Sequence, residues 1–169
     1  MSNSAIQSLI LAIFCVLPGP SAIASSVDRL QHDWAVASYE LAGDAQVQAL
    51  TQLASQADSA VSSTPNDPAI LIWTAIIKSS LAGKAGGFGA LGLVKEAKKL
   101  LEQSISIDSV ALDASAFTSL GSLYYQVPGW PLGFGNDKKA RKYLTDALAV
   151  NPDGIDPNYF YGDFLFEEG

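Results

Sequence analysis

The feature that most constrains the fold is a pattern of large and small side chains at helical spacing in the second half of the chain. One quartet follows the order large, large, small, large: Phe117, Leu120, Gly121 and Tyr124. After an insertion comes a set ordered small, large, small, proline: Ala140, Leu144, Ala147 and Pro152. Small residues let two antiparallel helices approach, and large ones fill the groove between neighbouring pairs. The pattern therefore predicts a helical hairpin that repeats along the chain.

Weaker copies of this pattern extend in both directions. Trp73 matches a first-helix position, and Tyr161 with Gly162 restarts the pattern after Pro152. Helical periodicity covers nearly everything beyond Ser25, without sustained alternation at period two. We therefore expect an all-α solenoid of antiparallel helix pairs, with about three and a half repeats over residues 25–169. The expected helices span residues 28–42, 44–61, 69–81, 93–107, 113–125, 137–150 and 156 to the end.

Two helix starts are marked by their sequence. Asp67 suits an N-cap and Pro68 the first helical position. The helix that follows is apolar almost all round, as a buried central helix would be. Asp153 and Asp156 stand in a turn before the last helix, where N-capping explains them. That turn lacks the alternating oxygen ligands of a calcium loop, so we assign no metal site.

The first 24 residues predict an export signal. Residues 8–17 form an apolar run too short to span a bilayer comfortably, and Ala22 and Ala24 suit a cleavage site. We expect cleavage after Ala24 and export to the periplasm. Cys15, the single cysteine, would leave with the signal. Thiol catalysis, disulfides and cysteine metal sites are then excluded for the mature chain.

Charge and motifs argue against several function classes. The net charge of −7 disfavours nucleic acid as a partner, because phosphate binding needs a basic stripe. The basic residues of 138–142 are expected to form a solvated helix face. Residues 87–92 spell a dinucleotide-binding fingerprint, but they follow a helix rather than a strand, so we interpret them as a link between helices. His32, the only histidine, cannot form a zinc site alone and is expected to be an ordinary helical residue.

The insertion between the two helices of the best repeat is the candidate binding element. Residues 127–136 hold two prolines, three glycines and two aromatic residues, Trp130 and Phe134. Their rings either pack over a helix end or face a ligand, and the sequence leaves both alternatives open. The candidate ligand or partner contacts are Trp130, Phe134, Tyr125 and Asp137.

With these motifs in place, the chain resembles bacterial exported tetratricopeptide-like proteins, related to the TatT component associated with TRAP-type transporters. The resemblance covers Pro68 to the C-terminus, and its most specific part is VPGWPLGFGND, residues 127–137. It implies a periplasmic helical-repeat protein whose role is binding. A narrower implication is an accessory role in a transport system.

Three functions are compatible with the sequence. The preferred one is a non-enzymatic binding or scaffold protein that holds a protein partner or a small apolar ligand, without cofactor or catalytic residues. The second is a hydrolase that uses carboxylates near residues 127–137. The third is a structural subunit, because the last helix carries more apolar surface than one face can bury. Phe160 and Phe164 would then contact a second copy, unless the chain continues beyond Gly169.

Overall fold

The protein is all-helical. The structure is a computed structural model that describes residues 20–169. Within that range the chain forms helices joined by short connections, and β pairing is limited to one isolated bridge between Gly129 and Gly135. No helix in this range is long and apolar enough to cross a bilayer. The helices are α1 (Pro20–Tyr39), α2 (Gly43–Ser63), α3 (Pro68–Ala85), α4 (Gly87–Ile107), α5 (Ala111–Gln126), α6 (Asp137–Val150) and α7 (Ile155–Glu168).

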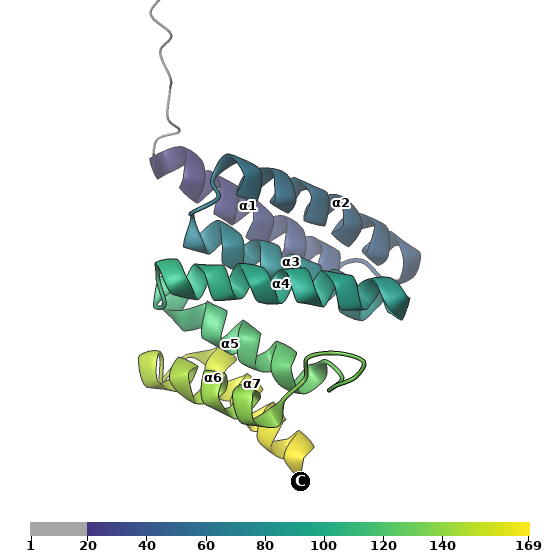
Figure 1. The fold of residues 1–169 in the computed structure, drawn as a ribbon. Helices are drawn as coiled ribbons and strands as arrows, with labels where there is room; N and C mark the ends of the chain where they lie inside the picture. The colour runs from purple at the N-terminus through teal and green to yellow at the C-terminus, as the bar shows by residue number, and fades with distance from the viewer. Residues whose placement is uncertain (1–19) are drawn as a thin grey trace, which may run out of the picture.

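The helices stack in chain order from α1 to α7 (Figure 1). Each helix packs against the next one along the chain. In addition, α1 contacts α3, α3 contacts α5 and α5 contacts α7. Among residues 20–169 the even-numbered helices make no such contacts with one another. The odd-numbered helices therefore form a continuous row on one side, and this packing is consistent with a helical repeat.

Two apolar clusters make up the core, and α3 belongs to both. Ile70 and Ile77 face the cluster formed with α1 and α2, whereas Ile72 and Ala75 face the cluster shared with α4 to α7. All four side chains are 0–1% exposed. This confirms the prediction of a buried central helix, and it explains why residues 69–81 are apolar on every side.

Close packing holds α5 against α6. A Cβ atom added to Gly121 would lie 2.7 Å from Cγ of Leu144, which is itself fully buried. Tyr124 stacks on Tyr143 of α6 with ring centroids 5.6 Å apart. Of the predicted repeat-core residues, Leu120, Gly121, Tyr124, Ala140, Leu144 and Ala147 are buried, and Trp73, Phe117 and Tyr161 are half-buried.

Pro152 and Gly162 are exceptions among the predicted core residues, because both are exposed. Pro152 lies in the connection after α6, outside the helix interface. At Gly162 the space that a Cβ atom would occupy is open, with nothing within 4 Å. The core prediction is wrong at these two positions.

The helix starts agree with the sequence in part. The Asp67 carboxylate accepts hydrogen bonds from the backbone N–H groups of Ala69 and Ile70, which confirms its role as the N-cap of α3. Before α7 the N-cap is Gly154, without a side-chain cap, so the capping role predicted for Asp153 and Asp156 is wrong.

Asparagines organise this turn instead of the two aspartates. The side chain of Asn158 donates to the carbonyl groups of Pro152 and Gly154, at 2.7 and 2.8 Å. The side chain of Asn151 fills the space beside Gly154. Both aspartates are left exposed.

Two other segments that were predicted to lie outside helices are helical in the structure. The glycine-rich segment is not a link, because α4 begins at Gly87 and includes residues 87–92. The predicted cleavage site at Ala22–Ala24 falls within α1, while the apolar run of 8–17 lies outside the described residues. Signal cleavage therefore stays a prediction.

Candidate binding groove

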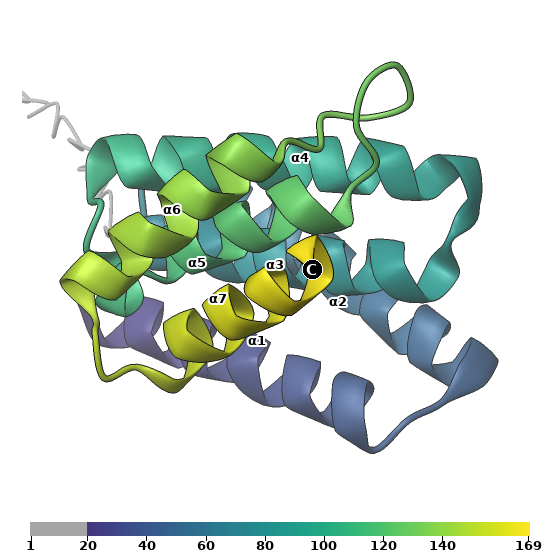
Figure 2. The same cartoon turned by 90° about the horizontal axis from the view of Figure 1, so that it is seen from below.

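A groove of about 870 Å³ runs along the row of odd-numbered helices. Helices α1, α3, α5 and α7 all contribute side chains to it, so residues more than 100 positions apart in sequence meet in one cavity. Viewed from below, α1 and α7 lie on one side of the molecule, and α4 with the 127–136 connection lies on the other (Figure 2). The groove is therefore a product of helix stacking rather than of one loop.

One wall of the groove is an aromatic cluster from α1 and α3. The Trp34 ring meets the rings of Tyr39 and Trp73 edge to face, each at 5.7 Å between centroids. Its indole Nε1–H donates to Oγ of Ser80 at 2.8 Å, which fixes the ring orientation. The indole Nε1–H of Trp73 is buried and has no hydrogen-bond partner among the described residues. Because this nitrogen has no exposed surface, only the ring of Trp73 is available to a ligand in the groove.

The opposite wall belongs to α7. Tyr159 and Phe160 pack edge to face at 5.2 Å, and both rings line the groove. Between the two aromatic walls lies a surface of short hydroxyl side chains from α3 and α5. These are Ser79, Ser80, Ser115, Thr118, Ser119 and Ser122. The groove therefore combines ring faces for apolar contact with a row of small hydrogen-bonding groups.

The charge of the groove is acidic. Asp113 and Asp156 line it, whereas no Lys, Arg or His does among residues 20–169. Neither carboxylate has a hydrogen-bond or ion-pair partner within this part of the chain. Two unpaired carboxylates repel an anionic ligand and favour a neutral or cationic one.

Backbone geometry brings one of these carboxylates to the groove. Leu112, Asp113 and Ala114 have φ values of 48°, 54° and 63°, so a left-handed turn lies within the bounds of α5, ahead of its right-handed part. For residues other than glycine this costs roughly 1–2 kcal/mol each, and packing must offset it. A second cavity of about 310 Å³ adjoins this turn and is lined by Asn151 and Ile155 beside the same carboxylates.

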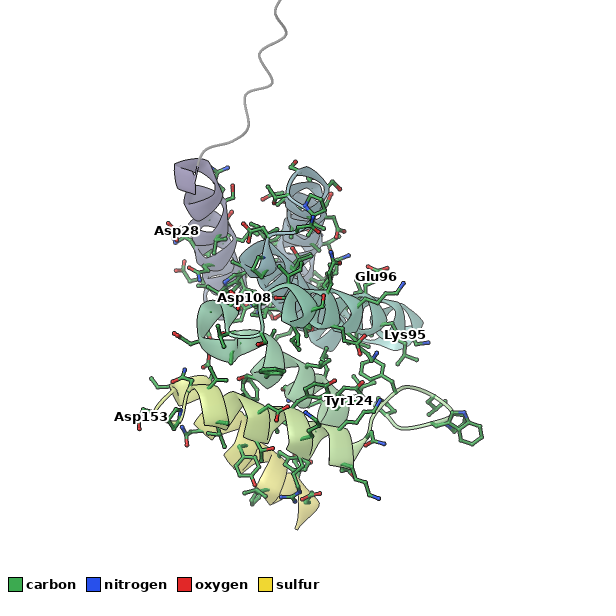
Figure 3. All side chains as sticks on the ribbon, turned by 60° about the vertical axis from the view of Figure 1, so that its left-hand side comes forward. Asp28, Lys95, Glu96, Asp108, Tyr124 and Asp153 are labelled. Carbon is green, nitrogen blue, oxygen red and sulfur yellow. The ribbon has the colours of Figure 1, made fainter. Side chains whose placement is uncertain are left out.

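The predicted contact residues lie elsewhere. Trp130, Phe134, Tyr125 and Asp137 are all absent from the lining of the groove. Trp130 is 90% exposed, and the loop that carries it projects from the body of the protein (Figure 3). Phe134 turns inward and packs edge to face on Tyr124 at 5.5 Å. The sequence analysis left the same two alternatives open for both rings, but Phe134 points into the protein and Trp130 points into solvent.

Of the other two predicted contacts, Tyr125 is bonded within the fold and Asp137 is exposed to solvent. The Tyr125 hydroxyl donates to Oδ2 of Asp163 at 2.6 Å and ties α5 to α7. Burial and this carboxylate raise the pKa of Tyr125 to about 12. Asp137 is an exposed residue in the first turn of α6, whose N-cap is Asn136.

The proposed oligomer contacts also need correction. Phe164 is 1% exposed, because it packs inside the chain's own core against Tyr125 and beneath the Arg141 guanidinium at 5.1 Å. Its ring is not available to a second copy. Phe160 is half-buried and lines the groove. The exposed apolar side chains of α7 are instead Ile155, Tyr159, Leu165 and Phe166.

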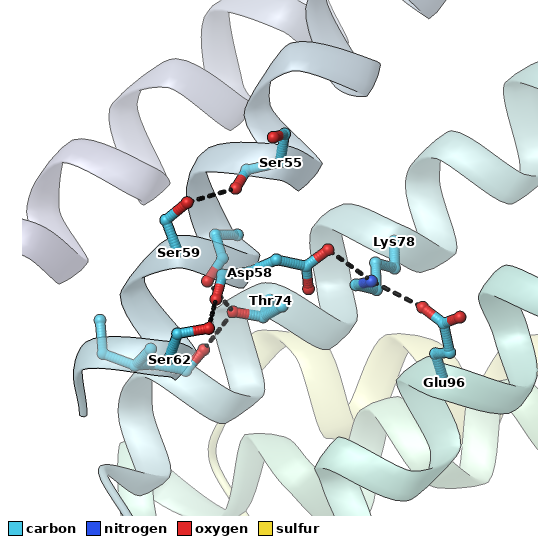
Figure 4. Close-up of polar contacts among 9 residues, drawn as sticks. Ser55, Asp58, Ser59, Ser62, Thr74, Lys78 and Glu96 are labelled. Atoms are coloured by element: carbon cyan, nitrogen blue, oxygen red, sulfur yellow. Dashed lines mark hydrogen bonds and ion pairs between the residues drawn. The ribbon is translucent and has the colours of Figure 1, made fainter. Parts of the chain in front are cut away.

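Two ion pairs that the sequence did not suggest link three helices through one buried lysine. Lys78 of α3 is 6% exposed, and its Nζ donates to Asp58 of α2 at 2.9 Å and to Glu96 of α4 at 2.7 Å (Figure 4). Burial lowers the pKa of Lys78, but the hydrogen bonds and charges of Glu96 and Asp58 outweigh burial and raise it overall. The sequence around Lys78 is apolar and its partners Asp58 and Glu96 are distant in sequence, so no local pattern indicates this contact.

A search against protein-family models and a search of curated protein sequences both find no match. The function must therefore be argued from the groove itself.

Proposed function

We propose that this chain is a non-enzymatic, periplasmic tetratricopeptide-like protein that binds a segment of a partner protein in the groove of its odd-numbered helices. The observation that carries this proposal is the continuous groove of about 870 Å³ to which α1, α3, α5 and α7 all contribute. A site spread over four stacked helices suits an extended or helical segment, because such ligands make contacts along their whole length.

The lining specifies the chemistry of the bound segment. Trp34 and Trp73 offer ring surface on one wall, and Tyr159 offers a further ring on the other. The hydroxyl row can satisfy backbone polar groups of a bound chain. Asp113 and Asp156 favour a segment with a positive charge. We therefore expect an apolar or aromatic segment that carries a Lys or Arg.

Two alternatives are less well supported. The volume also admits a small apolar ligand, since ligand cavities commonly measure about 300–1,000 Å³. A hydrolase would need paired carboxylates beside the 127–137 loop, but Asp137 is exposed there and Trp130 faces solvent. The accessory role in a transport system rests on the resemblance alone.

Site-specific photocrosslinking tests the groove. A photoreactive phenylalanine analogue is placed at Ser119 in the groove, and in a matched variant at Lys99 on the exposed side of α4. The full chain is irradiated in cells that normally make it. We expect a discrete adduct from position 119 and none from position 99. Separately, Tyr159→Ala, which removes a ring from the α7 wall of the groove, should reduce the amount of the same partner in native mass spectra of the purified chain.

Other outcomes separate the alternatives. Equal adducts from both positions would contradict the groove as the binding site. A bound mass below that of a peptide would replace the protein segment by a small ligand. Recovery of the chain only in the cytoplasmic fraction would contradict the periplasmic location.

A further inference from the structure

The connection between α5 and α6 presents an uncharged apolar tip to solvent. Trp130 is 90% exposed and Leu132 is 69% exposed, and residues 127–136 include no Asp, Glu, Lys or Arg. The loop projects beyond the helices that flank it (Figure 3). Large apolar side chains concentrated at a protruding tip mark a contact site rather than ordinary surface.

The base of this loop is firmly held. The backbone N–H of Asn136 donates to the carbonyl of Tyr124 at 2.7 Å, and that of Gly135 donates to Pro128 at 3.0 Å. Only glycine fits at position 135, because a Cβ atom would lie 1.9 Å from the carbonyl oxygen of Val127. Phe134 anchors the loop on Tyr124. The fold therefore fixes the loop at its base and leaves Trp130 and Leu132 outside.

Positive charge gathers beside the loop. Helices α4 and α6 hold seven of the ten Lys and Arg residues and four of the 17 Asp and Glu residues, a net charge of +3. The remainder has three basic and 13 acidic residues, a net charge of −10. Lys98 of α4 lies 5.9 Å from the ring centroid of Phe134, and Lys139 of α6 lies 5.2 Å from that of Tyr124. Lys95 and Lys138 have no ion-pair partner among residues 20–169.

We propose that this loop tip inserts into the interface of a bilayer that carries anionic lipids, while the lysines of α4 and α6 contact the headgroups. Tryptophan favours the membrane–water interface, since its ring is apolar and its N–H can reach a polar partner. Screening over about 8 Å at physiological salt keeps the acidic helices on the far side from opposing attachment. Attachment through this side leaves the groove, which lies on the other side, open to a partner.

A lipid surface fits this tip better than a protein surface does. A specific protein interface needs about 800 Å² on each partner, with a rim of hydrogen-bonding groups. The tip is one short loop without charged side chains, whereas insertion into a bilayer needs only the apolar tip and nearby cations. The inference does not depend on the proposed groove function.

Vesicle flotation tests the proposal with the purified chain. We expect the chain to float with vesicles of phosphatidylcholine that contain phosphatidylglycerol, to float less at high salt, and to stay unbound to pure phosphatidylcholine. Trp130→Ala should weaken the partition at least about tenfold, because one large apolar side chain is lost from the interface. Phe166→Ala removes an aromatic residue that is 85% exposed on α7 and lies outside the groove lining, and it should leave the partition unchanged.

Two variants that each remove one positive charge complete the test. Lys138→Gln should weaken the partition by roughly fivefold, whereas Arg29→Gln on α1 should not. Absence of binding to anionic vesicles at low salt would overturn the proposal. Equal binding by the Trp130→Ala and Phe166→Ala chains would overturn it as well. If vesicles fail to bind but Trp130 is required for capture of a protein, the tip is a protein contact and the membrane proposal is wrong.

Discussion

Gly121 allows a sharp test of the helix packing. The perturbation is Gly121→Ala, which adds one methyl group where α5 meets α6. That group would lie 2.7 and 2.9 Å from Cγ and Cδ2 of Leu144, and 3.1 Å from the backbone nitrogen of the same residue. Carbon atoms in good contact are about 3.5–4.0 Å apart, so the overlap approaches 1 Å. Leu144 is fully buried, and its backbone belongs to α6, so neither can move freely.

The size of the effect follows from two opposing terms. Overpacking of a core costs typically about 1–3 kcal/mol in the free energy of unfolding. The higher helix propensity of alanine returns about 1 kcal/mol. Gly162→Ala on α7 is the matched control, because it gains the same propensity where nothing lies within 4 Å. The difference between the two variants therefore isolates the packing cost, and Gly121→Ala should be the less stable by about 1–3 kcal/mol.

Urea denaturation followed by circular dichroism measures this difference. A thermal scan should place the midpoint of Gly121→Ala at least about 2 °C below that of Gly162→Ala. Adding Leu144→Ala to each variant gives a further check, since the enlarged space should accept the new methyl group and the two changes at the interface should couple. If Gly121→Ala is as stable as Gly162→Ala, the close approach of α5 and α6 is wrong.

Two further predictions concern polar contacts in the core. Asp58→Asn with Glu96→Gln leaves Lys78 buried without an anionic partner and should cost about 1–3 kcal/mol in urea denaturation, allowing for the exposure of both carboxylates. Lys78→Met should cost less, since it removes the charge but keeps the volume, and an equal cost would contradict this reasoning. For Tyr125, folding raises the pKa from 10 to about 12, so its stabilising contribution is complete below about pH 10 and is lost as the pH rises towards 12. Melting temperatures measured across that range should fall less steeply for Tyr125→Phe than for the exposed control Tyr159→Phe, and identical slopes would refute the assignment.

The helical framework could be predicted because local patterns determine it. The bounds of α6 match the predicted 137–150, where Asn136 caps the start and Asn151 follows the end. The start of α4 was missed, because glycines have low helix propensity and Gly87 reads as a break. The left-handed turn at 112–114 has little sequence signal, since no glycine occurs there and Asp113 is its only residue of a type that visits this conformation.

The groove was harder to predict than the helices. A polar stripe at Ser115, Thr118, Ser119 and Ser122 follows helical spacing and could have pointed to a solvated face of α5. The sequence gives no reason for Trp34 of α1 and Tyr159 of α7 to line one cavity, because their proximity depends on how every intervening helix stacks. The directions of the side chains in the 127–136 loop also could not be predicted from the sequence. Its composition predicts an aromatic insertion, but only the fold turns Phe134 inward and Trp130 outward.

Helix α3 belongs to both apolar clusters, and this has a consequence for how the protein unfolds locally. One side of α3 completes the core of α1 and α2, and the other completes the core of α4 to α7. Separation of α1 and α2 would expose Ile70 and Ile77 but leave the second core closed. Local unfolding can therefore proceed from the N-terminal end as a unit, while α3 stays protected until the whole chain unfolds. The amides of α3 should accordingly exchange with solvent hydrogen more slowly than those of α1.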